Sequence, residues 1–163
     1  MNPISIGNEV ADFEALSTGN KTIKLTDYRG RYVVIYFYPK DNTPGCTLEG
    51  QAFRDAHQQF TDLNAVILGV SRDSVRVHEG FKCKQAFPFD LLSDEDEKLC
   101  HLFDVIKMKN LYGKQVRGIE RSTFLIDPQG VLIRAWRKVK VKNHVVEVLD
   151  SLTEVTKNYP VCE

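Results

Sequence analysis

One cysteine stands at the predicted start of a helix, where the local backbone favours a reactive thiolate. Residues 31–38 are a run of β-branched and aromatic side chains, which predicts a strand buried on both faces. From 48 to 63, apolar residues recur mostly every four positions, as on an amphipathic helix. Thr43 is placed as the N-cap of that helix and Pro44 as its first residue. Cys46 falls in the first turn, where free N–H groups and the helix dipole favour an anion, so we expect it to ionise more readily than a free cysteine, whose pKa is about 8.5.

The residues around Cys46 favour chemistry over the alternative of a small, buried and unreactive cysteine. Thr43 lies one helical turn earlier and can bring its hydroxyl to the sulfur or to a bound oxygen, besides capping the helix. Backbone N–H groups around Gly45 can donate to a developing negative charge. Pro39 would shield the sulfur and stiffen the loop, or merely end the strand. A nucleophilic thiolate with donors around it is the chemistry that these residue types indicate.

This segment resembles the peroxidatic-cysteine signature of the peroxiredoxins. The pattern Pro-x-x-x-Thr-x-x-Cys is met by Pro39, Thr43 and Cys46, and Glu49 follows three residues later. The longer string from 37 to 49 is similar to the peroxiredoxin Q branch, also called bacterioferritin comigratory protein, and the likeness covers nearly the whole chain. The resemblance implies a thiol-dependent peroxidase of antioxidant defence, which reduces hydrogen peroxide and organic hydroperoxides without a metal, haem or flavin of its own.

The resemblance also implies a cation beside the thiolate. Arg121, at the start of a predicted strand, matches the position of a peroxiredoxin arginine, and Glu49 would orient it. The residue types alone do not select Arg121 among the basic side chains, and an exposed helical carboxylate is the alternative for Glu49. The histidines are interpreted as surface or packing residues: His57, His78, His101 and His144.

Peroxide attack leaves a sulfenic acid on Cys46, which a second thiol must resolve. Many members of the branch carry that thiol five residues later, where this chain has Gln51. A subgroup places it on the following helix, and Cys83 lies there between Lys82 and Lys84, which favour an exposed, relatively acidic thiol. Cys83 is therefore the favoured resolving cysteine. Disulfide formation would require local unwinding at the start of helix 43–62 and movement of the helix that carries Cys83.

Alternatives to Cys83 stay open, because sequence alone does not establish disulfide connectivity. Cys162 lies near the end of the chain and could reach Cys46, whereas Cys100 is expected to be a buried structural thiol. Without an internal partner, the protein would be a one-cysteine peroxidase resolved by an external thiol, or a peroxide sensor or relay. A disulfide oxidoreductase is disfavoured because there is no Cys-x-x-Cys. For the favoured mechanism, thioredoxin or a similar dithiol protein would be the reductant.

Composition indicates one globular domain, residues 1–163, because 42% of the residues are hydrophobic and 27% charged. Lys+Arg and Asp+Glu are both 22 and no basic tract interleaves with aromatic residues, so nucleic acid is not expected as a partner. No apolar stretch approaches the roughly 20 residues of a membrane span, and no signal peptide is visible. We expect a cytoplasmic, metal-free protein, and the zero net charge is compatible with a monomer.

The elements that must position these residues predict a thioredoxin-like α/β fold, with a central mixed sheet flanked by helices and an N-terminal β-hairpin. A strand, a helix and a second apolar strand imply a right-handed βαβ unit. Pro88 suggests that strand 87–92 lies at a sheet edge or begins at that proline. The other expected segments are a hairpin within 13–25, helix 74–86, a helix opening at 93–96, a surface loop 107–118, a hairpin within 122–136 and a closing helix 143–157.

Overall fold

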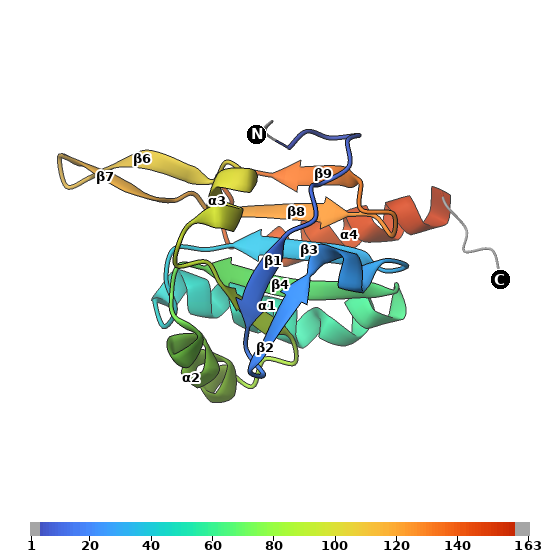
Figure 1. Cartoon of the computed structure of the whole chain (residues 1–163), viewed down its shortest axis with the longest axis horizontal. Helices are drawn as coiled ribbons and strands as arrows, with labels where there is room; N and C mark the ends of the chain where they lie inside the picture. Colours follow the sequence, from blue (N-terminus) through green and yellow to red (C-terminus); the bar gives the residue numbers. More distant parts are fainter. Residues whose placement is uncertain (1–3, 159–163) are drawn as a thin grey trace.

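The structure, a computed structural model, describes residues 4–158 and shows a mixed α/β architecture (Figure 1). The strands in chain order are β1 (Glu14–Ser17), β2 (Lys21–Lys24), β3 (Tyr32–Phe37), β4 (Ala65–Ser71), β5 (Asp90–Ser93), β6 (Ile106–Leu111), β7 (Lys114–Ile119), β8 (Ser122–Ile126) and β9 (Leu132–Trp136). The helices are the 3₁₀ turn η1 (Leu25–Tyr28), α1 (Pro44–Asp62), α2 (Val75–Gln85), α3 (Lys98–Leu102) and α4 (His144–Asn158).

Strand β3 lies inside the main sheet and carries the chain toward Cys46. Within residues 4–158 this sheet has the strand order β2-β1-β5-β4-β3-β8-β9. β3 pairs in parallel with β4 and antiparallel with β8, and all its residues are buried, as its uninterrupted apolar sequence predicts. The predicted βαβ unit, the mixed sheet and both predicted hairpins are confirmed.

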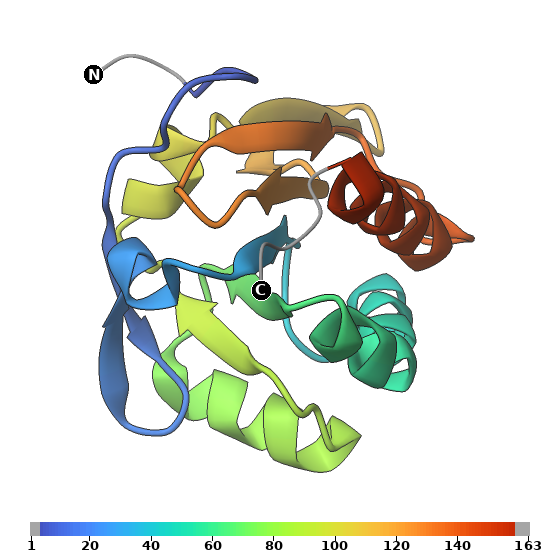
Figure 2. The ribbon, with the colours of Figure 1, turned by 90° about the vertical axis from the view of Figure 1, so that its right-hand side faces the viewer.

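Alternate residues of β3 enter separate hydrophobic clusters on the two faces of the sheet. Val34 and Tyr36 pack on the face that α1 and α4 cover, together with Phe53 of α1. Val33 and Ile35 pack on the other face, against the N-terminal segment and α3. Figure 2 shows α1 (teal) and α4 (red) on one side of the sheet and α3 (yellow) on the other. The alternation of side chains along a strand thus sets which face holds the Cys46 helix.

The prediction of a surface loop at 107–118 is wrong. β6 and β7 form an antiparallel hairpin there, which projects from the body of the molecule (Figure 1). Its strands are exposed over most of their length, and the alternation of apolar and polar residues that marks a half-buried strand is limited to the short stretch 106–109. The signal that was present is the turn, in which Tyr112 and Gly113 both have positive φ, as a two-residue hairpin turn requires.

Of the two alternatives predicted for strand 87–92, a position at the sheet edge is wrong, and a start at Pro88 lies two residues before the observed start at Asp90. β5 pairs with both β1 and β4, and Pro88 precedes its first residue, so no ladder hydrogen bond is lost. The next helix starts later than predicted, at Lys98, although Asp94 does accept hydrogen bonds from the backbone N–H groups of Leu99 and Cys100. None of the helices within the described residues is long and apolar enough to cross a membrane.

Candidate active site

The loop between β3 and α1 delivers Cys46 to the first turn of α1, as predicted. Pro44 is the first helical residue, and the carbonyl of Thr43 accepts from the N–H of Thr47 at 2.9 Å. Thr43 is the N-cap residue, as predicted, but its side chain makes no capping hydrogen bond, which corrects that part of the prediction. Its hydroxyl instead donates to the carbonyl of Lys40 at 2.7 Å and closes the loop. Pro39 is half-buried at the start of this loop.

Arg121, which directly precedes β8, brings its guanidinium to both Cys46 and Glu49. Its Nη2 lies 3.5 Å from Cys46 Sγ, and its Nη1 donates to Glu49 Oε1 at 2.7 Å. Cys46 is 2% exposed and Glu49 is fully buried, so the alternative of an exposed carboxylate is wrong. A Cβ on Gly45 would lie 3.1 Å from Arg121 Nη2, so the missing side chain leaves room for the guanidinium. Three residues that the sequence singled out therefore meet at the start of α1.

Burial and charge oppose each other within this group. Burial raises the pKa of Glu49 to about 7, although the Arg121 guanidinium pulls it down. Burial also disfavours the charge on Arg121, but Glu49 and Cys46 outweigh it and raise the pKa of Arg121. In the described part of the chain, Glu49 Oε2 is a buried side-chain oxygen without a hydrogen-bond partner. Within the described residues, this carboxyl is therefore hydrogen-bonded to Arg121 through one oxygen only. One ion pair compensates poorly for burying a charge, so the contact contributes little to stability, but it fixes the orientation of the guanidinium.

The β6–β7 hairpin adds a second basic side chain that the sequence did not point to. Lys109 of β6 donates to the carbonyl of Ile119, two residues before Arg121. Burial and then the positive charge of Arg121 lower the pKa of Lys109. Because the segment was interpreted as a loop, nothing in the sequence placed Lys109 near Cys46.

The other cysteines lie in different surroundings. Cys83 is exposed on α2, and within the described residues neither Cys46 nor Cys83 is in a disulfide. Cys100 is buried in α3, and burial together with Asp94 raises its pKa, which confirms the expectation of a buried structural thiol. Cys162 lies outside the described residues.

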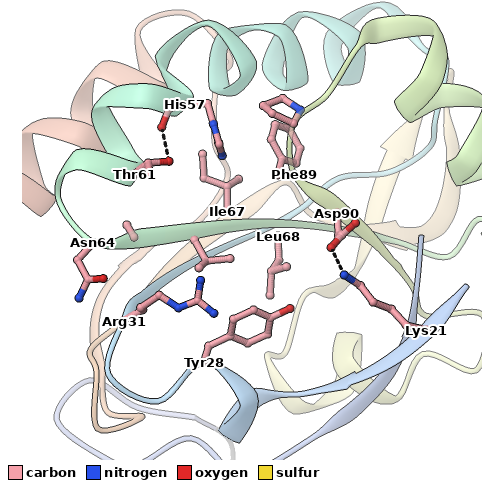
Figure 3. A pocket seen from close by; sticks show the side chains of 13 residues that line it. Lys21, Tyr28, Arg31, His57, Thr61, Asn64, Ile67, Leu68, Phe89 and Asp90 are labelled. Carbon is pink, nitrogen blue, oxygen red and sulfur yellow. Dashed lines mark hydrogen bonds and ion pairs between the residues drawn. The ribbon is translucent and has the colours of Figure 1, made fainter. Parts of the chain in front are cut away.

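A cavity of about 450 Å³ lies at the opposite end of the parallel strands from Cys46. Figure 3 shows Arg31, Asn64 and Phe89 around it, and these residues directly precede β3, β4 and β5. Cys46 follows the carboxyl end of β3. The Lys21–Asp90 ion pair, at 2.9 Å, borders this cavity. The cavity is thus separate from the cysteine site, which is a group of buried and partly buried side chains at the start of α1.

The chain is similar in sequence and structure to known peroxiredoxins. The model of the AhpC/TSA family matches residues 6–135. Peroxiredoxin Bcp of Bacillus subtilis is 53% identical over 154 residues, covering 94% of this chain and 98% of the relative. Peroxiredoxin Bcp of Xanthomonas campestris is 57% identical over 138 residues, covering 85% and 86%.

Solved structures of peroxiredoxins are also similar to this chain. The bacterioferritin comigratory protein of Xanthomonas campestris, studied for its alkyl peroxide reduction activity, matches with a TM-score of 0.86 and 50% identity, covering 93% of this chain and 97% of that one. A variant of PrxQ from Xylella fastidiosa matches with a TM-score of 0.90 and 46% identity, covering 96% and 99%. The predicted thioredoxin-like fold is thereby confirmed. The chain belongs to the AhpC/TSA family and, within it, to the peroxiredoxins of the Bcp or peroxiredoxin Q type.

Proposed function

We propose that this peroxiredoxin reduces hydrogen peroxide and organic hydroperoxides with Cys46 as the peroxidatic cysteine. The Cys46 thiolate attacks one peroxide oxygen, the O–O bond breaks, and the second oxygen leaves with a proton as water or alcohol. Cys46 becomes a sulfenic acid. The observation that carries the proposal is the contact of Arg121 with Cys46, because it sets a fixed positive charge where the thiolate and the reacting oxygens would lie. The activity of the Xanthomonas relative supports including alkyl peroxides.

The neighbouring side chains would divide the remaining tasks. Arg121 would stabilise the thiolate and the developing oxygen charge, and Glu49 would hold the guanidinium in place through its 2.7 Å contact. The hydrogen of the Thr43 hydroxyl is used on the carbonyl of Lys40, which leaves the oxygen lone pairs free to accept from the O–H of a bound peroxide. Pro39 would limit the access of water to the sulfur. None of these roles needs a resident metal or organic cofactor.

Cys83 is proposed as the resolving cysteine. Its thiolate would attack the Cys46 sulfenic sulfur, the S–O bond would break, and the hydroxide would leave as water after taking up a proton, so that one disulfide forms. Exposure of Cys83 supports this role, because a reductant must later reach the disulfide. Thioredoxin or a similar dithiol protein would restore both thiols by exchange.

The chain is proposed to act as a single-domain cytoplasmic monomer. A reducing compartment suits a protein whose chemistry needs free thiols. The expected sedimentation mass is that of one 18.6 kDa chain in both the reduced and the oxidised protein.

Peptide mapping after one equivalent of hydrogen peroxide tests the assignment of both thiols. In wild type, non-reducing mass spectrometry should find a Cys46–Cys83 disulfide. Cys83→Ser should stop at the sulfenic acid on Cys46, and Cys46→Ser should consume no peroxide. A link from Cys46 to Cys100 or Cys162, or a lasting sulfenic acid in wild type, would contradict the role of Cys83. Oxidation that spares Cys46 would contradict the peroxidatic assignment itself.

A further inference from the structure

A buried contact joins the loop before α1 to helix α2. Asp41 Oδ2 lies 2.6 Å from His78 Nδ1, and both side chains are fully buried. Tyr38 donates its hydroxyl to Asp41 Oδ1 at 2.6 Å, and the N–H of Asp41 donates to Asp73 Oδ2 at 2.9 Å. On its other side, His78 Nε2 lies 2.9 Å from the carbonyl of Leu92. The loop, α2 and β5 are therefore connected through one imidazole.

The partners of His78 require a proton shared with Asp41. The carbonyl of Leu92 can only accept, so Nε2 must carry a hydrogen. A neutral imidazole would then present a lone pair at Nδ1 to a carboxylate oxygen only 2.6 Å away. Such a short contact needs a hydrogen between the two atoms, so the pair exists as imidazolium and carboxylate, or as imidazole and carboxylic acid. Charge-assisted hydrogen bonds of this kind, away from water, are among the stronger contacts in a protein.

The position of this contact relates it to the two thiols. Cys46 follows Asp41 by five residues, and Cys83 follows His78 by five residues. Cys46 is buried and Cys83 is exposed, so the segments that carry them must rearrange before the sulfurs can meet. At the other end of α2, two partly buried contacts join it to α1, from Gln51 and Arg54 to Gln85. The Asp41–His78 contact is the fully buried one of these connections.

We propose that Asp41 and His78 are positioning residues that hold the active-site loop against α2 and thereby set the rate at which Cys83 reaches oxidised Cys46. The inference rests on the proposed role of Cys83. Peroxide reacts with the majority conformation, in which the contact is intact. Disulfide formation draws on a minor, rearranged conformation, in which a buried charged or protonated partner is left without its hydrogen bond. A weaker contact should raise the minor population and the resolution rate in proportion, while the peroxide step changes little.

The test separates the two steps in single-turnover experiments on full-length protein. Reduced samples are mixed with hydrogen peroxide, quenched in acid, alkylated and analysed by mass for thiol, sulfenic acid and disulfide. In His78→Ala, the rate of disulfide formation should rise about tenfold, the scale of one lost hydrogen bond to a charged group. The rate constant for peroxide should stay within about twofold of wild type on the same population argument. At excess cumene hydroperoxide, less sulfinic acid should accumulate, because faster resolution competes with over-oxidation.

Two further variants separate positioning from a general loss of stability. Asp41→Asn keeps the shape and can donate its amide to a neutral His78, so it loses only the shared proton and should give a smaller rise than His78→Ala. It also keeps the test valid if His78→Ala does not fold. Val155→Ala, in the core side of α4, lowers global stability and should leave both rates unchanged.

The outcomes are distinct. The proposal is overturned if both His78→Ala and Asp41→Asn form the Cys46–Cys83 disulfide at a rate within twofold of wild type. An equal acceleration in Val155→Ala overturns it too, since the effect would then follow stability alone. If wild type forms no Cys46–Cys83 disulfide, the resolving role of Cys83 fails first, and the inference built on it fails for that separate reason.

Discussion

At the scale of single residues, the buried carboxyl group of Glu49 lowers the stability of the folded protein, and it also holds the guanidinium of Arg121 in place. Glu49 is fully buried, and in the described part of the chain its side-chain carboxylate is hydrogen-bonded through Oε1 to Arg121, whereas Oε2 has no partner. Burial raises its pKa from 4.5 to about 7, because the interior solvates the carboxylate poorly and one ion pair does not compensate. The folded protein therefore binds a proton at Glu49 more tightly than the unfolded chain does. The stability that this preference contributes is complete below pH 4.5 and is lost as the pH rises through 7.

Glu49→Gln should change how stability depends on pH. Gln keeps the shape and does not titrate, so between pH 5 and pH 8 the free energy of unfolding of wild type should fall by about 2–3 kcal/mol relative to the variant. Urea unfolding of reduced protein at several pH values measures this difference. Glu147→Gln removes the same charge from the exposed surface of α4 and is the control. If the free energy of unfolding depends on pH in the same way in wild type and in Glu49→Gln, the raised pKa of Glu49 is contradicted.

At the scale of elements, the position of α1 depends on a glycine that faces an aromatic ring. A Cβ at Gly50 would lie 2.3 Å from Phe87 Cζ, closer than any real side-chain contact. Phe87 is buried and stacks on Phe89, so its ring has little room to move. Gly50 lies one turn after Cys46, so the close approach of α1 to this ring helps to set where the first turn of the helix lies.

Replacing Gly50 or Gly80 by alanine should change the free energy of unfolding in opposite directions. Gly50→Ala should lower the free energy of unfolding by about 1–3 kcal/mol, because overpacking against Phe87 outweighs the better helix propensity of alanine. Gly80→Ala, in α2, meets no atom within 4 Å and should raise it by about 0.5–1 kcal/mol. Equilibrium urea unfolding of the reduced proteins checks both. Stabilisation by Gly50→Ala would show that the ring moves aside.

At the scale of the whole molecule, the sheet separates Cys46 from Cys100. Cys46 belongs to the hydrophobic cluster beneath α1 and α4 and lies in the first turn of α1. Cys100 belongs to the cluster on the opposite face, under the N-terminal segment. Its thiol is fully buried, and burial and Asp94 both disfavour its thiolate. The proposed rearrangement around Cys46 would therefore leave Cys100 enclosed.

Cys100 should report global unfolding. In native buffer, iodoacetamide should modify Cys83 at least about 10³-fold faster than Cys100, because exposure of Cys100 requires opening of a core whose total stability is several kcal/mol. The rate at Cys100 should rise with urea in step with global unfolding, as measured by alkylation and peptide mass mapping. Labelling of Cys100 as fast as that of Cys83 would mean that its face of the sheet opens locally.

The sequence by itself determined the chemistry that depends on a few consecutive residues. The strand, the turn and the first helical residues around Cys46 follow from neighbouring side chains, because a helix start is defined within one turn. The motif around Cys46 also identified the family, and with it Arg121 and Glu49. The β6–β7 hairpin escaped prediction because its strands are largely exposed and their period-two pattern is limited to residues 106–109.

Only the tertiary structure brings residues that are far apart in the chain into contact. Arg121 and Cys46 are 75 residues apart, and Asp41 and His78 are 37 apart. Such pairs depend on the order of strands in the sheet, since β8 lies beside β3, and α2 connects β4 to its other neighbour β5. His78, which the sequence described as a surface or packing residue, is buried between the Asp41 carboxyl group and the Leu92 carbonyl. Local residue types place Cys46 at the start of a helix, whereas long-range packing specifies its charge environment and its contacts with distant residues.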